Sequence, residues 1–481
     1  MTASSTSHSV FGFALIACTA GAALAGSREA RANGRLPAAH ELVISPTNPN
    51  TFAIEATFGL FISQDTGASF GWVCEPAIGY PATLNWDPSI GITATSILGG
   101  LPNGISVSAD QGCSWKTTMD GQIVDVVVRQ DDPHSALVLA STYTGITDAG
   151  SNSFSTQVFA THDDGATWAP QGVAIESDVE VETIDVAPSD PDVIYIGGAR
   201  TTPESDGSIE RTGVVLASTN GGTSYTATAI PLQDSEFAFS AFVSAVDPND
   251  AQRVYVRVSL STTSVANSNV DRLVVSEDGG SSFQTVYQAK GALLGFALSG
   301  DGTKVFLGDS VAGVFSASAP PVDSGATFVF SQRSSASVAC LTWSAGDLYA
   351  CANQPQNPLL REIAVSTDDG ATFATLFRFG CVSGALACSS GTLEDTCGPE
   401  FGSVQSQVGA CDIAFADAGE PDSSVFERDA GGQSVRPSSR GCGCVIGAGA
   451  PAGGGGILGL LVAVLVGLRS RRTDRMALSR R

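Results

Sequence analysis

Short apolar runs alternate with clusters of turn residues along residues 41–378 of this 481-residue chain. Val, Ile, Phe and Thr dominate the runs, whereas Gly, Pro, Asn and Asp gather between them, which is typical of β-strands joined by tight turns. The stretch from Ile184 to Ile196 shows an apolar run, a Pro/Asp turn and a second apolar run. Amphipathic stretches of helical period are hard to find. The pattern predicts an all-β fold of many short strands.

An octapeptide of the form Ser/Thr-x-Asp-x-Gly-x-Thr/Ser-aromatic recurs in the same region, with Thr161–Trp168 as a clear copy. Seven copies begin at residues 63, 108, 161, 218, 276, 321 and 366, and the sixth has lost its leading Ser/Thr. The third position is occupied by Asp65, Asp110, Asp163, Asn220, Asp278, Asp323 and Asp368. Regular spacing of this kind indicates an internal repeat.

Each position of the octapeptide has a folding reason. Asp and Asn side chains accept hydrogen bonds from backbone N–H groups a short way along the chain, and Gly supplies a positive φ. The hydroxyls add local bonds to the backbone, and the aromatic residue starts the next strand. A calcium site at Thr161–Gly165 is disfavoured, because the twelve-residue loop and closing Glu of an EF-hand are absent. We therefore predict structural turns, with no metal ligands.

The octapeptide resembles the Asp-box, or BNR repeat, of β-propeller proteins such as sialidases, xyloglucanases and the sortilin ectodomain. Its steps of 45 to 58 residues each have room for four strands. The resemblance implies a seven-bladed β-propeller of four-stranded antiparallel blades over residues 41–378, with one Asp-box per blade. Polar insertions at 142–155, 200–211 and 261–269 lengthen three steps. We expect these insertions to be loops on a propeller face, where binding usually takes place.

Residues outside the repeats divide into four segments. Residues 1–32 contain the apolar run Val10–Ala25 followed by small-x-small cleavage candidates, which indicates a signal peptide. Residues 379–411 form a Cys-rich extension. Residues 412–441 are rich in Asp, Gly, Ser and Pro and are predicted to be a flexible linker.

Residues 442–481 form the fourth segment. Cys442 and Cys444 precede an uncharged run, 445–468, which is long enough to cross a bilayer and is followed by Arg residues. This order resembles the MYXO-CTERM sorting signal of myxobacterial exported proteins, which implies removal of the helix and attachment at the surface through the Cys region. A plain C-terminal membrane anchor is the alternative. Both predict an exported protein held at the cell surface or outer membrane.

Eight cysteines lie between the two ends, and an even number in an exported chain suggests disulfides. Cys340 and Cys351 would face each other across a hairpin, and Cys74 and Cys113 sit in successive repeats and are a second candidate pair. The last four can pair in three ways, of which we favour 381–411 with 388–397. The candidates are Cys74, Cys113, Cys340, Cys351, Cys381, Cys388, Cys397 and Cys411. No Cys-x-x-Cys occurs among them, which disfavours zinc.

The chain is strongly acidic, with a formal net charge of −24. Excluding the leader, which carries +1, and the tail from residue 445, which carries +5, leaves −30 for the part between them. Such a surface repels nucleic acid and anionic membrane. We therefore expect no nucleic-acid partner, and contact with a membrane only through the C-terminal segment.

Two hydrolase classes are suggested by the resemblance. A sialidase implies three Arg residues on a substrate carboxylate, but the Arg-Ile-Pro motif is missing and only Arg35 lies between the leader and residue 128. The later candidates, Arg200, Arg211, Arg253, Arg257 and Arg272, have no motif around them. A xyloglucanase implies two carboxylates facing across two propellers, and this chain supplies one. The acids Asp125, Asp185 and Asp247 could reach a central face, although capping of turns explains them equally well.

No catalytic constellation is evident, because the four histidines, His8, His40, His134 and His162, fall in the leader or in expected turns. We therefore predict no catalytic residues and no cofactor. The predicted function is a non-catalytic binding or adhesion module, acting as a monomer, for a glycan or a protein at the face loops. The alternative is a secreted glycoside hydrolase of the xyloglucanase-like or sialidase-like class.

Overall fold

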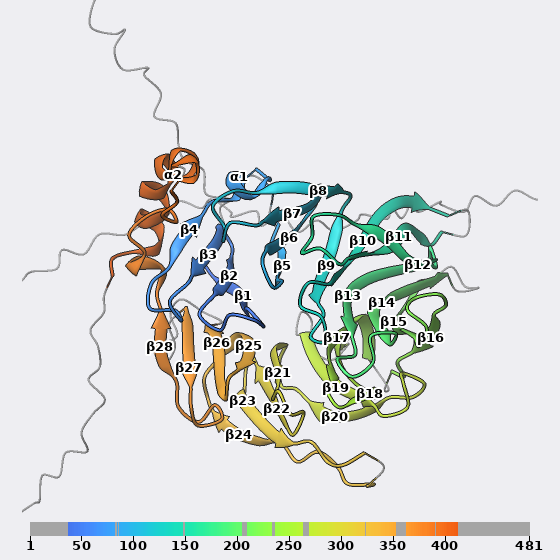
Figure 1. Ribbon diagram of the computed structural model, residues 1–481. Helices are drawn as coiled ribbons and strands as arrows, with labels where there is room; N and C mark the ends of the chain where they lie inside the picture. The colour runs from blue at the N-terminus through green and yellow to red at the C-terminus, as the bar shows by residue number, and fades with distance from the viewer. Residues whose placement is uncertain are drawn as a thin grey trace, which may run out of the picture. The chain divides into compact units, whose positions relative to one another are not determined.

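The structure is a computed structural model that describes residues 37–81, 84, 86–147, 150–203, 209–232, 236–262, 269–322, 324–352, 362–389 and 391–411. Within these residues, seven four-stranded antiparallel sheets are arranged in a ring as a seven-bladed β-propeller (Figure 1). The predicted fold class is confirmed. The predicted leader, linker and sorting segment, with Cys442 and Cys444, lie outside the described residues, as does Asp323.

Each blade is a meander whose strands follow the order of the chain. Blades 1 and 2 consist of β1 (Ala39–Ile44), β2 (Phe52–Ala56), β3 (Gly59–Ser63) and β4 (Gly71–Val73), then β5 (Ser89–Ile92), β6 (Ile97–Leu101), β7 (Gly104–Ser108) and β8 (Lys116–Asp120). Blades 3 and 4 consist of β9 (Ile123–Val128), β10 (Ala136–Ile146), β11 (Asn152–Thr161) and β12 (Ala169–Ile175), then β13 (Val179–Val186), β14 (Ile194–Pro203), β15 (Ile209–Ser218) and β16 (Thr226–Ala229).

The remaining blades have the same order. Blade 5 consists of β17 (Glu236–Asp247), β18 (Asp250–Thr262), β19 (Asn269–Ser276) and β20 (Gln284–Gln288). Blade 6 consists of β21 (Leu293–Leu298), β22 (Lys304–Asp309), β23 (Gly313–Ser318) and β24 (Ser331–Ser334). Blade 7 consists of β25 (Val338–Ser344), β26 (Asp347–Ala352), β27 (Ile363–Ser366) and β28 (Ala374–Phe377).

The core lies between neighbouring blades rather than inside one of them. β2 and β3 are buried along their whole length, so both faces of these strands pack in the core and their sequences are mostly apolar. Aromatic rings join one blade to the next, for example Phe306 of blade 6, which stacks on Trp343 of blade 7 with centroids 5.1 Å apart. Such a pair contributes about 0.5–1.5 kcal/mol beyond the area that it buries.

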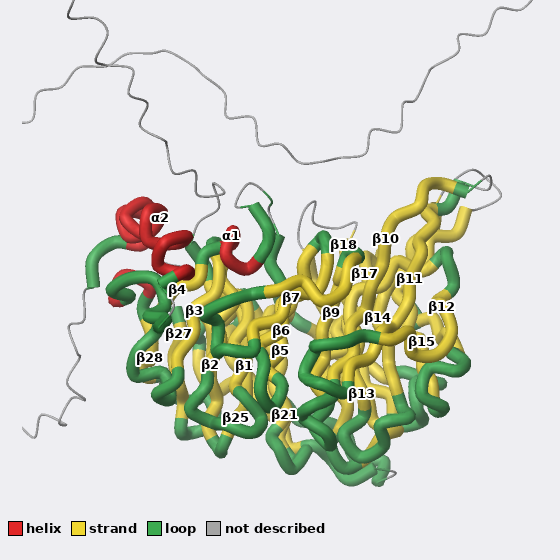
Figure 2. The backbone as a smooth tube through the Cα atoms, turned by 45° about the horizontal axis from the view of Figure 1, so that its top comes forward, coloured by secondary structure: helices red, strands yellow, loops and turns green. Residues whose placement is uncertain are grey.

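The meander gives the ring two different faces. The turn face carries the connections between first and second strands and between third and fourth strands, which include the octapeptides. The loop face carries the connections between second and third strands and between blades. The hairpins of β10 with β11, β14 with β15 and β18 with β19 extend on the loop face, on the same side as α1 (Glu75–Ile78) and α2 (Thr392–Val408) (Figure 2).

The three predicted insertions form the ends of these long hairpins. Residues 142–155, 200–211 and 261–269 were expected to be loops, but the described residues of 142–155 and 200–211 mostly continue the flanking strands, with β10 pairing with β11 as far as Ile146 and Asn152 and β14 pairing with β15 as far as Pro203 and Ile209. In 261–269 the described residues are the strand ends at 261–262 and 269. Cross-strand pairing satisfies the backbone groups of such a polar segment. In their described residues, the paired strands of blades 3, 4 and 5 therefore project from the loop face.

No strand is exchanged to close the ring in the described residues, because blade 1 and blade 7 each contain four consecutive strands. The inner strands instead pack side by side, and Thr342 Oγ1 donates to the carbonyl of Leu42 at 2.7 Å. Phe52 and Tyr349 add an edge-to-face ring contact at 5.6 Å. The two ends of the propeller are therefore joined by side-chain contacts between complete blades.

The C-terminal extension, residues 379–411, contains η1 (Phe379–Cys381) and α2 and folds back onto the first blade. Trp72 of β4 forms a parallel bridge with Ala385, and Leu386 donates to the Trp72 carbonyl at 2.8 Å. A Cβ on Gly71 would lie 2.5 Å from Leu386 Cα, so only Gly permits this approach. The extension therefore covers the outer edge of blade 1, which would otherwise be open.

All eight candidate cysteines form disulfides. Cys340–Cys351 and Cys381–Cys411 are bonded as predicted. The predicted pairs Cys74–Cys113 and Cys388–Cys397 are wrong, since the structure has Cys74–Cys397 and Cys113–Cys388. The reason is that the extension reaches blades 1 and 2, which brings cysteines 323 and 275 residues apart into contact. Two disulfides therefore fasten the end of the propeller to its beginning.

In the part of the chain that the structure describes, no helix is long and apolar enough to cross a membrane. The predicted membrane-spanning run, 445–468, lies outside that part.

Candidate functional site

The octapeptide acids lie inside their own turns. In the copy at Ser366, the Asp368 carboxylate accepts the Thr372 N–H at 2.8 Å and the Thr372 hydroxyl at 2.7 Å. Ser366 Oγ donates to Asp368 at 2.8 Å and accepts the Gly370 N–H at 2.8 Å. Both Asp369 and Gly370 have positive φ, +58° and +81°. The same hydrogen-bond pattern recurs at Asp65, Asp110, Asp163 and Asp278. Asn220 also accepts the Ser224 N–H, but its Nδ2 donates to the Ser224 hydroxyl instead of accepting from it.

These turns have little capacity left for a ligand. The backbone N–H and hydroxyl of Thr372 lower the pKa of Asp368 to about 2, because both stabilise the charged carboxylate. The carboxylate oxygens are already occupied by donors from the same turn. The octapeptide acids of the turn face therefore act by accepting hydrogen bonds that stabilise their own turns.

A groove on the loop face has a different composition. It has a volume of about 440 Å³ and lies where blades 2, 3 and 4 meet. The residues that give it chemical character are Trp86, Asp87, Tyr143, Phe154, Glu180 and Glu182. We call it the loop-face groove.

One wall of the loop-face groove is aromatic. Tyr143 is 52% exposed and packs edge to face on Phe154 with centroids 5.7 Å apart. These rings come from the long hairpin of β10 and β11. The half-buried Trp86 is fixed by its Nε1–H, which donates to the Gly100 carbonyl at 3.1 Å. Exposed aromatic faces held by a rigid hairpin are suited to stacking against apolar or sugar faces of a ligand.

A second, acidic part of the lining comes from the start of β13. Glu180 accepts a hydrogen bond from Arg211 Nη1 at 2.6 Å, while Glu182 lies 4.0 Å from Arg211 Nη2. Pairing shifts between Val181 and Thr183, so Glu182 occupies a β-bulge. Burial raises the pKa of Glu182, and the charge of Glu180 adds to the rise. This part of the lining thus combines an ion-paired carboxylate with one that holds its proton more tightly.

Three other acids face the axis of the ring and connect blades. Each carboxylate accepts a backbone N–H from the next inner strand: Glu41 from Ile90 at 3.2 Å, Asp125 from Ile184 at 2.8 Å and Asp185 from Val246 at 3.0 Å. Ser89 and Thr183 accept Val126 and Val243 N–H groups in the same way. These side chains act as inter-blade links around blades 1 to 5.

Loss of hydration inside the ring raises the pKa values of the linking acids. The pKa rises to about 8 for Glu41, about 6 for Asp125 and about 7 for Asp185, with desolvation as the largest cause. The third acid proposed from sequence, Asp247, accepts the Asn249 N–H at 2.9 Å and pairs with Arg253 at 3.5 Å. None of the three acids proposed from sequence, Asp125, Asp185 and Asp247, is among the residues named above as lining the loop-face groove.

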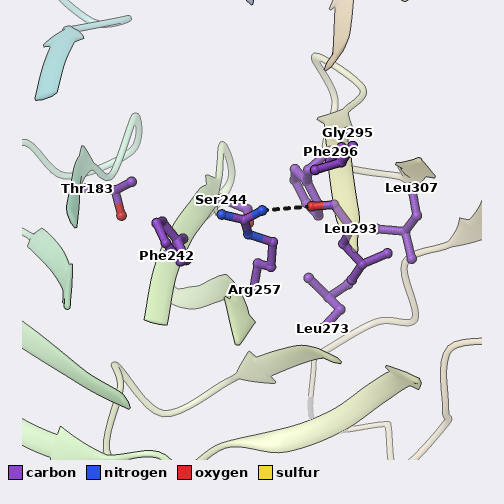
Figure 3. Close-up of a pocket in the computed structure, with 10 residues that line it drawn as sticks. Thr183, Phe242, Ser244, Arg257, Leu273, Leu293, Gly295, Phe296 and Leu307 are labelled. Atoms are coloured by element: carbon purple, nitrogen blue, oxygen red, sulfur yellow. Dashed lines mark hydrogen bonds between the residues drawn. The ribbon is translucent and has the colours of Figure 1, made fainter. Parts of the chain in front are cut away.

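A smaller pocket of about 220 Å³ lies beside β13, between blades 4, 5 and 6. Figure 3 shows Arg257 in its middle, close to Phe242 and bonded to the Leu293 carbonyl. The guanidinium stands 4.1 Å from the Phe242 ring centroid and 3.8 Å from Asp271. Burial lowers the pKa of Arg257, which the charges of Asp271 and Glu182 oppose. This arrangement supports the arginine with protein groups on several sides.

The other arginines named from sequence are also held by neighbours. Arg200 pairs with Glu176 and Asp178, and Arg253 pairs with Glu277 and donates to the Pro320 carbonyl. Arg272 donates to Thr285 and to the Pro231 carbonyl. These three arginines make contacts different from those of Arg211 and Arg257.

The histidines are divided between the two faces. His134 Nδ1 lies 2.8 Å from Asp164, and His162 Nδ1 lies 2.8 Å from Ser135 Oγ, both at the turn face. His40 was expected in a turn, but it lies in β1, where pairing shifts between Ala39 and Glu41. His8 is outside the described residues.

The ring of seven blades defines this chain as a β-propeller protein. A sequence profile of the sortilin–Vps10 family, described as sortilin, neurotensin receptor 3, matches residues 103–305. This match covers less than half of the chain and supports the propeller class. No curated protein matches the chain.

Solved structures similar to the chain share little of its sequence. The GH74 xyloglucanase of Xanthomonas campestris is 13% identical with a TM-score of 0.30, over 72% of this chain and 65% of that one. A Dyadobacter fermentans protein of unknown function is 13% identical with a TM-score of 0.37, over 68% and 94%. The α-L-arabinofuranosidase Arb93A of Fusarium graminearum is 11% identical with a TM-score of 0.36, over 58% and 88%.

Proposed function

We propose that this propeller is a non-catalytic binding module that takes a glycan in the loop-face groove. The observation that carries the proposal is that exposed Tyr143 and half-buried Phe154 line the same groove as Glu180 and Glu182. Aromatic faces can stack on sugar rings, and carboxylates can accept hydrogen bonds from sugar hydroxyls. A protein ligand is the other class that the predicted binding function includes.

The cellular setting is part of the same proposal. The octapeptides act as Asp-box repeats, residues 1–32 direct export, and residues 442–481 attach the protein to the cell surface. Four disulfides support an oxidising compartment. Fractionation of cells producing the chain should recover it in the envelope, and deletion of residues 442–481 should release it to the medium. Recovery in the cytoplasm would contradict this setting.

The binding test uses the purified full-length chain, oxidised, with a panel of neutral, cationic and anionic oligosaccharides. Retention on immobilised glycans and release of reducing sugar are read in the same samples. We expect retention without release, and Tyr143→Ala should weaken retention about tenfold because it removes one stacking face. Val329→Ala is the matched control, since Val329 is 73% exposed and lies outside the groove. Equal loss in both variants, or no retention of any glycan, would contradict a glycan site in the groove.

A glycoside hydrolase is the second candidate, and Glu182 is the observation that favours it. A hydrolase pairs one carboxyl that keeps its proton near neutral pH with a second that is ionised. Glu182 has a raised pKa and stands beside the ion-paired Glu180. Release of reducing sugar that Glu182→Gln abolishes, while Glu394→Gln on exposed α2 leaves it intact, would replace the binding proposal with this one.

A further inference from the structure

Three side chains with metal-ligand chemistry meet near the edge of the loop-face groove. His40 Nδ1 lies 3.3 Å from Asp87 Oδ2 and 3.7 Å from Glu55 Oε2. One ligand atom from each residue falls within 4.8 Å of the others. Among the described residues, no other group of three His, Cys, Asp or Glu side chains meets this spacing.

Three separate segments bring these ligands together. His40 occupies the bulge in β1 between Ala39 and Glu41. Glu55 is in β2, and its carboxylate is 2% exposed and directed at the His40 ring. Asp87 follows Trp86, which is anchored on Gly100 of the neighbouring blade. Blade 1 thus supplies two ligands from hydrogen-bonded strands, and the connection to blade 2 supplies the third.

We propose that His40, Glu55 and Asp87 bind one divalent transition-metal cation of the zinc class. Ligands on a metal with bonds of about 2.0–2.2 Å stand a little over 3 Å apart, close to the two distances measured here. With a neutral imidazole the three ligands carry two negative charges, which match a divalent ion. One imidazole nitrogen with two carboxylate oxygens suits zinc or manganese better than calcium, which takes six to eight oxygens.

The proposed ion would have an open side. Asp87 lines the loop-face groove, and His40 and Asp87 are 41% and 33% exposed. Three protein ligands leave at least one coordination position for water or for a ligand hydroxyl. The metal site does not depend on glycan binding, so it can be tested without any ligand of the groove.

The chain contains a matched control for a simple ion pair. His134 Nδ1 and Asp164 Oδ2 are 2.8 Å apart on the turn face, closer than His40 and Asp87. No third His, Cys, Asp or Glu completes a group there among the described residues. A His–Asp pair alone should bind zinc weakly, so His134→Gln separates a three-ligand site from general affinity for histidine.

The test is equilibrium dialysis of the full-length, oxidised chain against Zn²⁺, with Ca²⁺ in a parallel arm and bound metal counted by elemental analysis. We expect one Zn²⁺ per chain, with affinity lowered more than about tenfold in His40→Gln and in Asp87→Asn. His134→Gln should bind as the unmodified chain does. Ca²⁺ should bind at least tenfold more weakly than Zn²⁺.

Long-range imidazole nitrogen spectra give a second readout, because the chain has only four histidines. Zn²⁺ should shift the His40 signals and leave those of His134 unchanged. Retained zinc in His40→Gln, equal loss in His134→Gln, or no stoichiometric zinc would overturn the proposal. Thermal unfolding of each variant without metal shows whether it folds. If His40→Gln does not fold, the zinc affinity of Asp87→Asn decides the question.

Discussion

The acids of the turn face and those at the axis and loop face have contrasting surroundings. Asp368 and its equivalents receive donors from their own turns, and its pKa falls to about 2. Asp185 and Glu182 lie where hydration is partly lost, and their pKa values rise. Carboxylates on the turn face therefore stabilise the local backbone in their charged form. Carboxyls at the axis and on the loop face are instead shifted toward their neutral form by burial.

This difference separates structural repeats from candidate sites. A residue that recurs in every blade with the same hydrogen bonds is explained by the blade. The loop-face groove, in contrast, combines Trp86, Tyr143 and Glu182 from three different blades or connections. None of these residues belongs to a repeated octapeptide. A carboxyl such as Glu182, whose pKa is raised by burial and by a neighbouring like charge, is more typical of functional positions.

The largest expected effect is a loss of folding stability when the disulfides of the C-terminal extension, residues 379–411, are removed. Cys113 lies in a turn-face octapeptide and Cys74 follows β4 toward the loop face, and both are bonded to residues 379–411. Replacing both cysteines of either bond by Ser should lower the free energy of unfolding by about 2–4 kcal/mol. Denaturant unfolding under oxidising conditions measures this loss.

Removing both bonds together should cost more than the sum of the two separate losses. When one disulfide is intact, forming the other closes only a short loop, through residues 388–397 and 74–113. When neither is present, forming the first must close a loop of 275 or 323 residues, which spans nearly the whole propeller. The excess should be about 1–2 kcal/mol from loop-closure entropy. Additive losses would show that the extension holds blades 1 and 2 independently of ring closure. Replacing Cys340 and Cys351, 11 residues apart, provides the single-hairpin control.

The second effect is the pH dependence of the inner acids. The folded-state pKa of Asp185 is about 7, above its ordinary value of 3.8, so its contribution is fully present below about pH 4 and is lost as pH rises through 7. The turn acid Asp368 behaves in the opposite way, and its contribution is lost as pH falls below about 4 toward 2. Stability should therefore be greatest near pH 4–5.

Asp185→Asn tests this sign. Asn stays neutral and keeps one oxygen for the Val246 N–H, so the variant should lose less stability than the unmodified chain between pH 5 and 8. Because Asp185 is only half-buried, solvent screening reduces the effect, and we expect the variant to gain about 2 kcal/mol at pH 8 relative to pH 5. Thermal unfolding at both pH values measures it, and parallel pH curves for the two proteins would exclude Asp185 as the source.

The blades could be predicted from sequence because their determinants are local and repeated. Six of the octapeptides each fix a turn within eight residues and so set the spacing of the third and fourth strands, whereas the copy at 321 falls between the separated strands β23 and β24 and includes Asp323, which lies outside the described residues. Cys340–Cys351 was predictable because one short hairpin holds both residues. The partners of Cys74 and Cys113 were not, since they depend on a fold-back across the whole ring.

The groove could be predicted only in part. The insertion at 142–155 indicated a binding face, and it supplies Tyr143 and Phe154. Glu182 and His40 were missed because their directions depend on β-bulges, which leave no clear mark in a single sequence. For Asp125 and Asp185 the sequence leaves a central face and turn capping as alternatives, and in the structure their carboxylates reach the next blade. Contacts between blades follow from the closed ring, which no single repeat contains.

The smallest expected effect separates the charged turns from the neutral one. Ser366 donates to the Asp368 carboxylate, whereas Ser218 donates to the Asn220 amide oxygen at 3.0 Å. Both hydroxyls also accept the N–H of the following Gly, so replacement by Ala removes the same number of bonds. A bond to a charged group contributes about 1.5–3 kcal/mol and a neutral one about 0.5–1.5 kcal/mol. Ser366→Ala should therefore lower the free energy of unfolding by about 1 kcal/mol more than Ser218→Ala at pH 7, and the difference should shrink as pH falls toward 2, where Asp368 becomes protonated. A difference that is unchanged between pH 7 and pH 2 would mean that packing, rather than carboxylate charge, distinguishes the two turns.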